Sequence, residues 1–177
     1  DMPIGFAYDG VSPLDRKYLR HVLELEEDGE LVFPSDRKLD KATIPEACKL
    51  QRKILAEQPD RSVTFVVVGF STNLKRLLES DADEYSDFNG VELVRKKVKL
   101  LSIMAGNFPY YEPEWNIAMD IPAAAFTFEH WPTDIVICDK RMGRAVKLAS
   151  SHMTNDYPVP MEHPLYVAYK YHPEGRM

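Results

Sequence analysis

The chain has 177 residues, of which 45% are hydrophobic and 28% charged, so it has the composition of an ordinary globular protein and a length that fits one domain. The net charge of −6 and the lack of a basic stripe argue against a nucleic-acid partner. No run of 18 apolar residues could span a membrane and no secretory signal is visible, so we expect a cytoplasmic protein without a membrane partner.

The first sixty residues are expected to hold one main helix. Residues 3–6 read as a short strand, and the acidic text LEEDGE (25–30) reads as a solvated turn. The text TIPEACKLQRKILAE (43–57) has apolar residues spaced for one helix face. Thr43 is expected to cap this helix, and Pro45 fits its first turn.

Three short apolar segments follow, and two expected helices, 71–80 and 90–97, lie between the first segment and the second. These segments read as buried parallel strands that are covered on both faces. They span residues 63–68, 98–106 and 134–139. The order predicts an α/β fold, a Rossmann-like, mostly parallel sheet with helices on both faces. The cysteines, Cys48 and Cys138, lie in no CxxC pattern, so two buried free thiols are expected.

The stretch between the second and third strands carries polar residues ahead of an apolar helix. Pro122 is best tolerated in the first turn of a helix, so the helix is expected to begin near Asp120, which can cap it. Residues 107–119 are therefore expected to form a loop or a single turn. Ligands bind beyond the carboxyl ends of parallel strands, so residues 114–116 occupy a place for binding groups. The alternative is that they are a solvated charge, a packing residue and a turn former.

The C-terminal text is expected to hold a short helix over 141–150, a loop over 151–164 and a helix over 164–172. Neither end of the sequence reads as a finished terminus, so we expect the chain to be the middle part of one domain that is incomplete at both ends.

Three motifs in order, followed by a looser C-terminal match, resemble the inosine–uridine-preferring nucleoside hydrolases. That family has a turn of the type TGPLTNLA, a strand ending in MGG, and EFNI…D before an alanine-rich helix. The counterparts here are VGFSTNLKRLL (68–78), IMAGN (103–107) and EWNIAMDIPAAA (114–125). The text HPLYVAYKYHPEGRM (163–177) is similar to a branch of the same family. The likeness covers residues 60–177 well and the first sixty loosely.

The resemblance implies a nucleoside hydrolase-like fold and a calcium-dependent ribonucleoside N-glycosidase. In that family a calcium ion holds the ribose diol and a water, and the glycosidic bond breaks through an oxocarbenium-like transition state. Glu114 and Asn116 match the catalytic pair that binds the sugar hydroxyls. The other matching positions are the calcium-binding backbone carbonyl at Val68, and the substrate-binding Asn73, Met104, Asn107 and Trp115. For Asn73, support of the helix start is an equal alternative to ligand contact.

Two departures from the family pattern concern the metal. The family's DxDxxxDD cluster does not occur, and the nearest acidic text, DADEYSD (81–87), follows a surface helix and reads as a solvated loop. The final calcium-binding Asp would fall beyond residue 177. The histidines His152, His163 and His172 lie outside the family's leaving-group motif. We therefore expect most Ca²⁺ ligands to lie outside this chain, and this chain alone to be inactive.

Two alternatives remain open at this stage. The first alternative to the enzyme is a non-catalytic nucleoside- or sugar-binding relative, including an inactive fragment, and the second is an unrelated doubly wound domain. The expected partners are a small-molecule nucleoside and further copies of the chain. Self-association is favoured because a missing strand would leave a sheet edge and apolar surface exposed.

Overall fold

A computed structural model describes most of the chain. The described residues are 2–11, 19–34, 43–110, 112–147, 149–156 and 163–172. The chain divides into two compact units. The larger comprises Asp1–Ser12 and Leu39–Ala145, and the smaller comprises Pro13–Lys38 and Val146–Met177. The single domain expected from the sequence stays a prediction.

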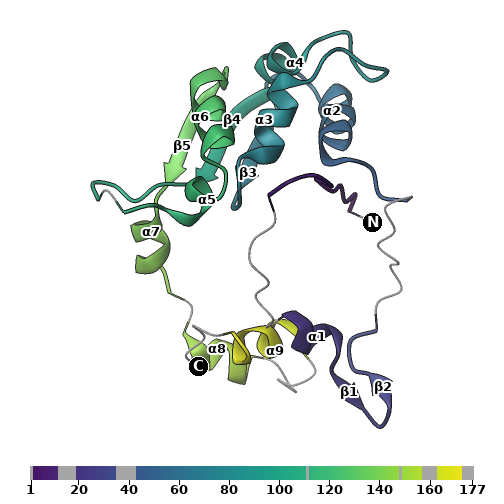
Figure 1. Cartoon of the computed structure of the whole chain (residues 1–177), viewed down its shortest axis with the longest axis vertical. Helices are drawn as coiled ribbons and strands as arrows, with labels where there is room; N and C mark the ends of the chain where they lie inside the picture. The colour runs from purple at the N-terminus through teal and green to yellow at the C-terminus, as the bar shows by residue number, and fades with distance from the viewer. Residues whose placement is uncertain are drawn as a thin grey trace. The chain divides into compact units, whose positions relative to one another are not determined.

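The larger unit is built on a three-stranded parallel sheet in the order β3-β4-β5 (Figure 1). The strands are β3 (Val63–Val67), β4 (Val98–Met104) and β5 (Asp134–Cys138). Each pair of neighbours is parallel, and the rows across the sheet include Phe65, Leu101 and Ile135. The expected α/β fold with a parallel sheet is therefore confirmed.

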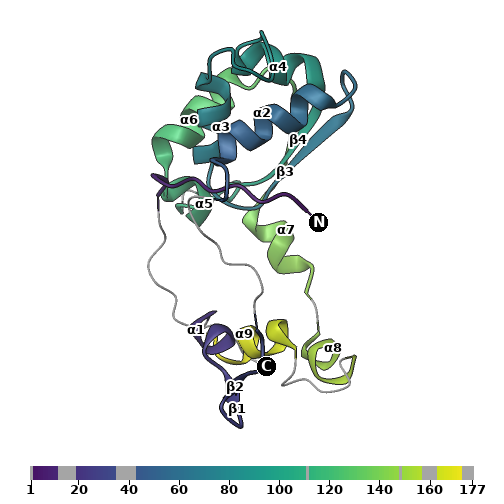
Figure 2. The same ribbon diagram turned by 90° about the vertical axis from the view of Figure 1, so that its right-hand side faces the viewer.

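Helices connect and cover these strands, as both ribbon views show (Figure 2). They are α2 (Ala47–Glu57), α3 (Thr72–Glu79), α4 (Gly90–Lys97), α5 (Trp115–Ala118), α6 (Ile121–His130) and α7 (Lys140–Ala145). The core holds leucines of α2, α3 and α4 together with Leu101 and Ile103 of β4. Phe65 and Ile135 pack against it from the two outer strands. The face of the sheet that carries these residues is the helix-covered face.

The opposite face is less covered than the sequence indicated. Burial alternates along β3, where Phe65 is half-buried and Val66 is 70% exposed. Val66 lies in one row with Ser102 and Val136, and Val136 is 53% exposed. A run of β-branched residues predicts a buried strand, but its apolar character is the same whether one face of the sheet is covered or both.

Helix α2 begins at a later residue than expected, because a contact between residues far apart in the sequence fixes its start. The helix begins at Ala47, and Glu46 caps it by accepting from the backbone N–H groups of Cys48 and Lys49. Phe6 pairs with Glu46 in a parallel bridge, which keeps the backbone of Glu46 extended just ahead of the helix. Thr43 is therefore not the cap. Residues 3–6 contribute this one bridge in place of the expected strand.

The smaller unit contains α1 (Arg20–Leu23), β1 (Glu26–Glu27), β2 (Glu30–Leu31), α8 (Ser150–Asn155) and α9 (Pro164–Lys170). β1 and β2 form an antiparallel hairpin around Asp28 and Gly29, both with positive φ, where a turn was expected. The ring of His21 stacks on that of Tyr171, with 4.1 Å between the ring centroids. This contact links the N-terminal segment of the unit to its C-terminal segment. α9 confirms the last expected helix, whereas α8 replaces part of the expected loop over 151–164. The pair His152–Asp156, at 2.7 Å, supports that turn of helix.

Candidate functional site

The candidate site lies where β4 and β5 end. Gly106 follows β4 with φ +82°, and a Cβ there would come within 2.6 Å of the Phe108 ring. Its carbonyl accepts from the N–H of Lys140, the first residue of α7, at 3.0 Å. The loop after β4 is therefore fixed to the loop after β5 through the backbone.

Glu114 holds this loop against α5. Its side chain is 5% exposed and accepts from three backbone N–H groups. The distances are 2.9 Å to Asn116 N, 3.2 Å to Ile117 N and 3.3 Å to Gly106 N. The carboxylate is thus the N-cap of α5 and also a bridge back to the end of β4. A carboxylate offers about four acceptor positions, so one remains for another donor.

Asn116 points back to the end of β4. Its Nδ2 donates to the carbonyl of Met104 at 3.2 Å and lies 3.1 Å from the Met104 Sδ. These contacts fix the orientation of the amide and leave Oδ1 as an acceptor. Glu114, Asn116 and Met104, all expected at the site, are therefore brought together by short contacts.

Val68 lies beside this group. It follows Val67, which pairs with Ile103, so it stands across from Met104 on the neighbouring strand. Adjacent strands are about 4.8 Å apart, so the Val68 backbone lies roughly one strand spacing from that of Met104. The Val68 side chain is 78% exposed, and its role as a calcium-binding carbonyl stays a prediction.

The three remaining expected residues occupy different surroundings. Asn73 is in the first turn of α3, and its Oδ1 is buried without a hydrogen-bond partner among the described residues. Asn107 is 9% exposed in the loop after β4, and Trp115 is 39% exposed at the start of α5. Thr72 donates to Asp120, the cap of α6, which ties the start of α3 to the start of α6. This cap and the helix start at Ile121 are as expected.

Asp139 is a site residue that the sequence reasoning missed. It follows β5 directly, is 6% exposed, and accepts from Met142 N at 3.0 Å and Arg141 Nε at 3.1 Å. The hydrogen bond from the Met142 N–H has the largest effect and lowers the pKa of this carboxyl below its ordinary value. The hydrogen bond and charge of Arg141 lower this pKa further. An acidic residue at the carboxyl end of a strand was the available signal, but Asp139 was read as the last residue of the strand itself.

The residues that the structure describes do not make a calcium site. The described part of the chain contains no group of three or more His, Cys, Asp or Glu side chains that could hold a metal ion. The carboxylate of Glu114 already accepts three backbone N–H groups, and calcium requires about six to eight oxygens. The acidic segment 81–87 takes part in a salt bridge within the larger unit. Asp83 binds the buried Arg52 through two contacts of 2.6 and 3.0 Å.

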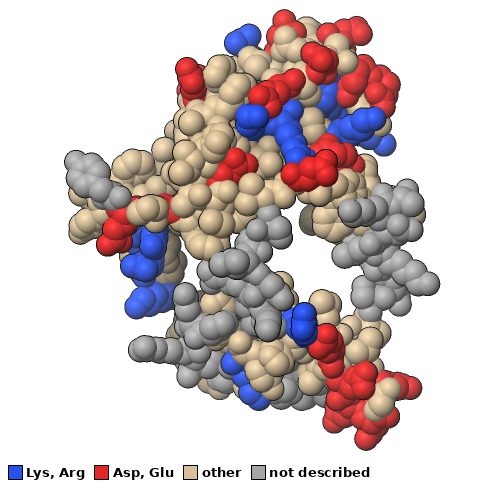
Figure 3. Space-filling model, viewed as in Figure 1, with Lys and Arg blue, Asp and Glu red and all other residues tan. Residues whose placement is uncertain are grey.

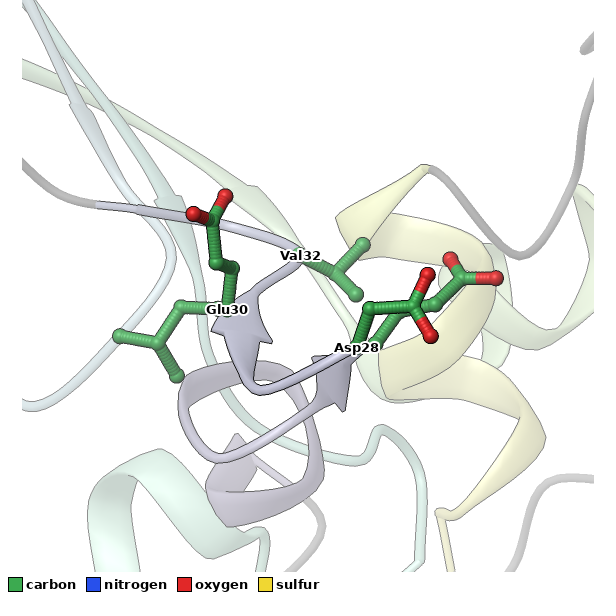
Figure 4. Close-up of a pocket in the computed structure, with 5 residues that line it drawn as sticks. Asp28, Glu30 and Val32 are labelled. Atoms are coloured by element: carbon green, nitrogen blue, oxygen red, sulfur yellow. The ribbon is translucent and has the colours of Figure 1, made fainter.

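The smaller unit carries a separate hollow at its hairpin (Figure 4). It is lined by Glu27, Asp28, Glu30, Leu31 and Val32. The space-filling view shows acidic side chains gathered over the β1–β2 hairpin (Figure 3). The hollow contains no residue that the sequence assigned to a site.

Within the ranges that the structure describes, no helix is long and apolar enough to cross a membrane. No protein-family model, curated protein or solved structure matches the chain.

Proposed function

We propose that this chain is part of a cytoplasmic ribonucleoside N-glycosidase, an enzyme that hydrolyses a nucleoside to ribose and base. The observation that carries the proposal is the cluster of Glu114, Asn116 and Met104 at the carboxyl end of a parallel sheet. That place is where α/β proteins bind small ligands. The sequence motifs EWNI and IMAGN supply the same residues in the nucleoside hydrolase pattern.

In this proposal Asn116 is the residue that contacts the sugar. Its Oδ1 accepts a hydrogen bond from a ribose hydroxyl, and the two contacts of Nδ2 prevent the amide group from rotating. A fixed amide dipole stabilises positive charge that develops on the sugar ring as the glycosidic bond breaks. Glu114 is mainly a positioning residue. It fixes the first turn of α5 and keeps one acceptor position for a second hydroxyl.

The described residues alone do not supply enough ligands for the calcium ion of the family that the sequence resembles. The ion would need carboxylates from outside the described part of this chain. The specific alternative is a nucleoside-binding relative without catalysis, which the lack of a suitable acidic group among the described residues favours. The two candidates share the same sugar contacts and differ in whether ribose is released.

The test measures binding of inosine and uridine by calorimetry, and ribose release with and without added calcium. Asn116→Ala is expected to lower turnover in the complete protein more than substrate affinity, because it acts on developing charge. Asn89→Ala is the matched control. It removes the cap of α4 and should leave both readouts unchanged. Binding without release would favour the binding relative. An absence of binding in the complete protein, or an Asn116→Ala effect confined to KM, would contradict the catalytic role.

A further inference from the structure

The outer edge of β5 presents apolar side chains on both faces of the sheet. Val136 is 53% exposed on one face, and the next residue, Ile137, is 38% exposed on the other. β5 is the last strand in the order β3-β4-β5, so its outer backbone groups have no strand partner in the described part of the chain. An edge of this kind favours pairing with another strand.

The other edge of the sheet differs. On β3 the residues of the helix-covered face, Val63, Phe65 and Val67, are half-buried and pack against the core. Ile137 has the equivalent position on β5 but is not part of that core. Ile135 packs against the core but Ile137 does not, so the described helices cover β5 only up to Ile135 and leave Ile137 for a neighbour beyond β5.

Asp134, the first residue, is the one charged residue of β5, and the residues after it are apolar. Natural edge strands are protected by proline, lysine or a β-bulge. β5 reads DIVIC and pairs with β4 in regular register from Leu100↔Asp134 to Met104↔Cys138. β3, in contrast, has a register irregularity between Val63 and Thr64.

The direction of the backbone groups fixes how a second strand could add. The carbonyl of Cys138 accepts from Ala105 and so faces β4. Backbone direction alternates along a strand, so the groups of Val136 also face β4, and those of Ile135 and Ile137 face outward. Residues with outward groups form the hydrogen-bonded pairs of an antiparallel ladder.

We propose that β5 pairs in antiparallel fashion with β5 of a second copy of this chain, around a two-fold axis at Val136. Ile135 then forms hydrogen-bonded pairs with the partner's Ile137, about four bonds in total. Val136 lies opposite the partner's Val136. The sequence is suited to this because isoleucines flank the central valine symmetrically. A parallel pairing would instead place the Asp134 carboxylates side by side.

The interface closes at two copies, because a two-fold axis uses the same edge on both partners. One five-residue strand pair buries less than the roughly 1,200 Å² of a standard stable interface. We therefore expect a monomer–dimer equilibrium that depends on protein concentration, with the dimer at twice 20.3 kDa.

The first test is sedimentation equilibrium of the full chain over a hundredfold range of concentration. Val136→Lys should weaken the dimer at least tenfold, because it places two like charges at the two-fold axis. Val66→Lys is the matched control, since Val66 is an exposed valine on the same face of the other edge strand. Circular dichroism establishes that both variants fold.

The second test fixes the register. In a chain with Cys48→Ser and Cys138→Ser, Val136→Cys should give a disulfide-linked dimer with oxidised glutathione, because residues opposite each other in a non-hydrogen-bonded pair are close enough. Val66→Cys should not. A monomer at every concentration would overturn the proposal. So would a dimer that resists Val136→Lys, or one that both lysine variants weaken equally, which would indicate association through the sheet face.

Discussion

Replacing Glu114 with alanine is expected to destabilise the larger unit even without a ligand. The change removes the cap of α5, which costs about 1 kcal/mol of unfolding free energy. It also leaves the Gly106 N–H, which donates to Glu114 in a buried contact, without an acceptor, and this costs about 1–3 kcal/mol more. The expected loss is therefore about 2–4 kcal/mol. For a chain of this length that lowers Tm by roughly 5–15 °C.

The measurement is thermal and urea unfolding of Glu114→Ala and Glu114→Gln, with Glu112→Ala as control. Glu112 is an exposed carboxylate two residues earlier, so its removal should change stability by less than about 0.5 kcal/mol. The glutamine variant retains one side-chain acceptor and should fall between the two. A Glu114→Ala protein as stable as Glu112→Ala would refute the view that the carboxylate holds the loop.

Two further outcomes follow from other contacts. Asp83→Asn should lower the unfolding free energy at neutral pH by about 3 kcal/mol, because it removes the charge that faces the buried Arg52. The hydrogen bond from Arg52 lowers the pKa of Asp83, so this contribution is present above the ordinary value near 3.8 and is lost as pH falls through the lower folded pKa. Urea unfolding at neutral and acid pH should show the difference between the two proteins narrowing in acid, and a constant difference would contradict it. Gly106→Ala should lower Tm because of its positive φ and the ring beside it, whereas Gly69→Ala, with open space around it, should not; equal Tm values would argue against strain.

The elements that the sequence predicted well are those governed by local signals. Pro122 and Asp120 locate the start of α6, because proline geometry and side-chain capping act within a few residues. The three strands were found because each is a short, contiguous and largely apolar run. The start of α2 was not found, because the bridge between Phe6 and Glu46 joins residues forty positions apart.

The candidate site was predicted by position but not by contact. The motif placed Glu114 and Asn116 at the end of β4, and the structure brings them together there. The three backbone donors that engage Glu114 depend on how the loop after β4 turns, which no spacing in the sequence specifies. Asp139 was missed for a related reason. Its partners Arg141 and Met142 are local, but its buried position depends on the neighbouring strand.

The acidic groups of the site limit the ligands that it could take. Glu114 and Asp139 are both nearly buried. Glu114 uses its oxygens on backbone N–H groups, and Asp139 uses its oxygens on the Met142 N–H and on the Arg141 guanidinium. Backbone N–H groups, and Arg141 beside Asp139, thus largely balance the two charges, and little negative charge is left to attract a cation. The acceptors that remain free, on Asn116 and at one position of Glu114, suit neutral hydroxyl groups. The described residues therefore offer no group that would concentrate a metal ion, and we expect added calcium to leave the thermal unfolding of the chain unchanged.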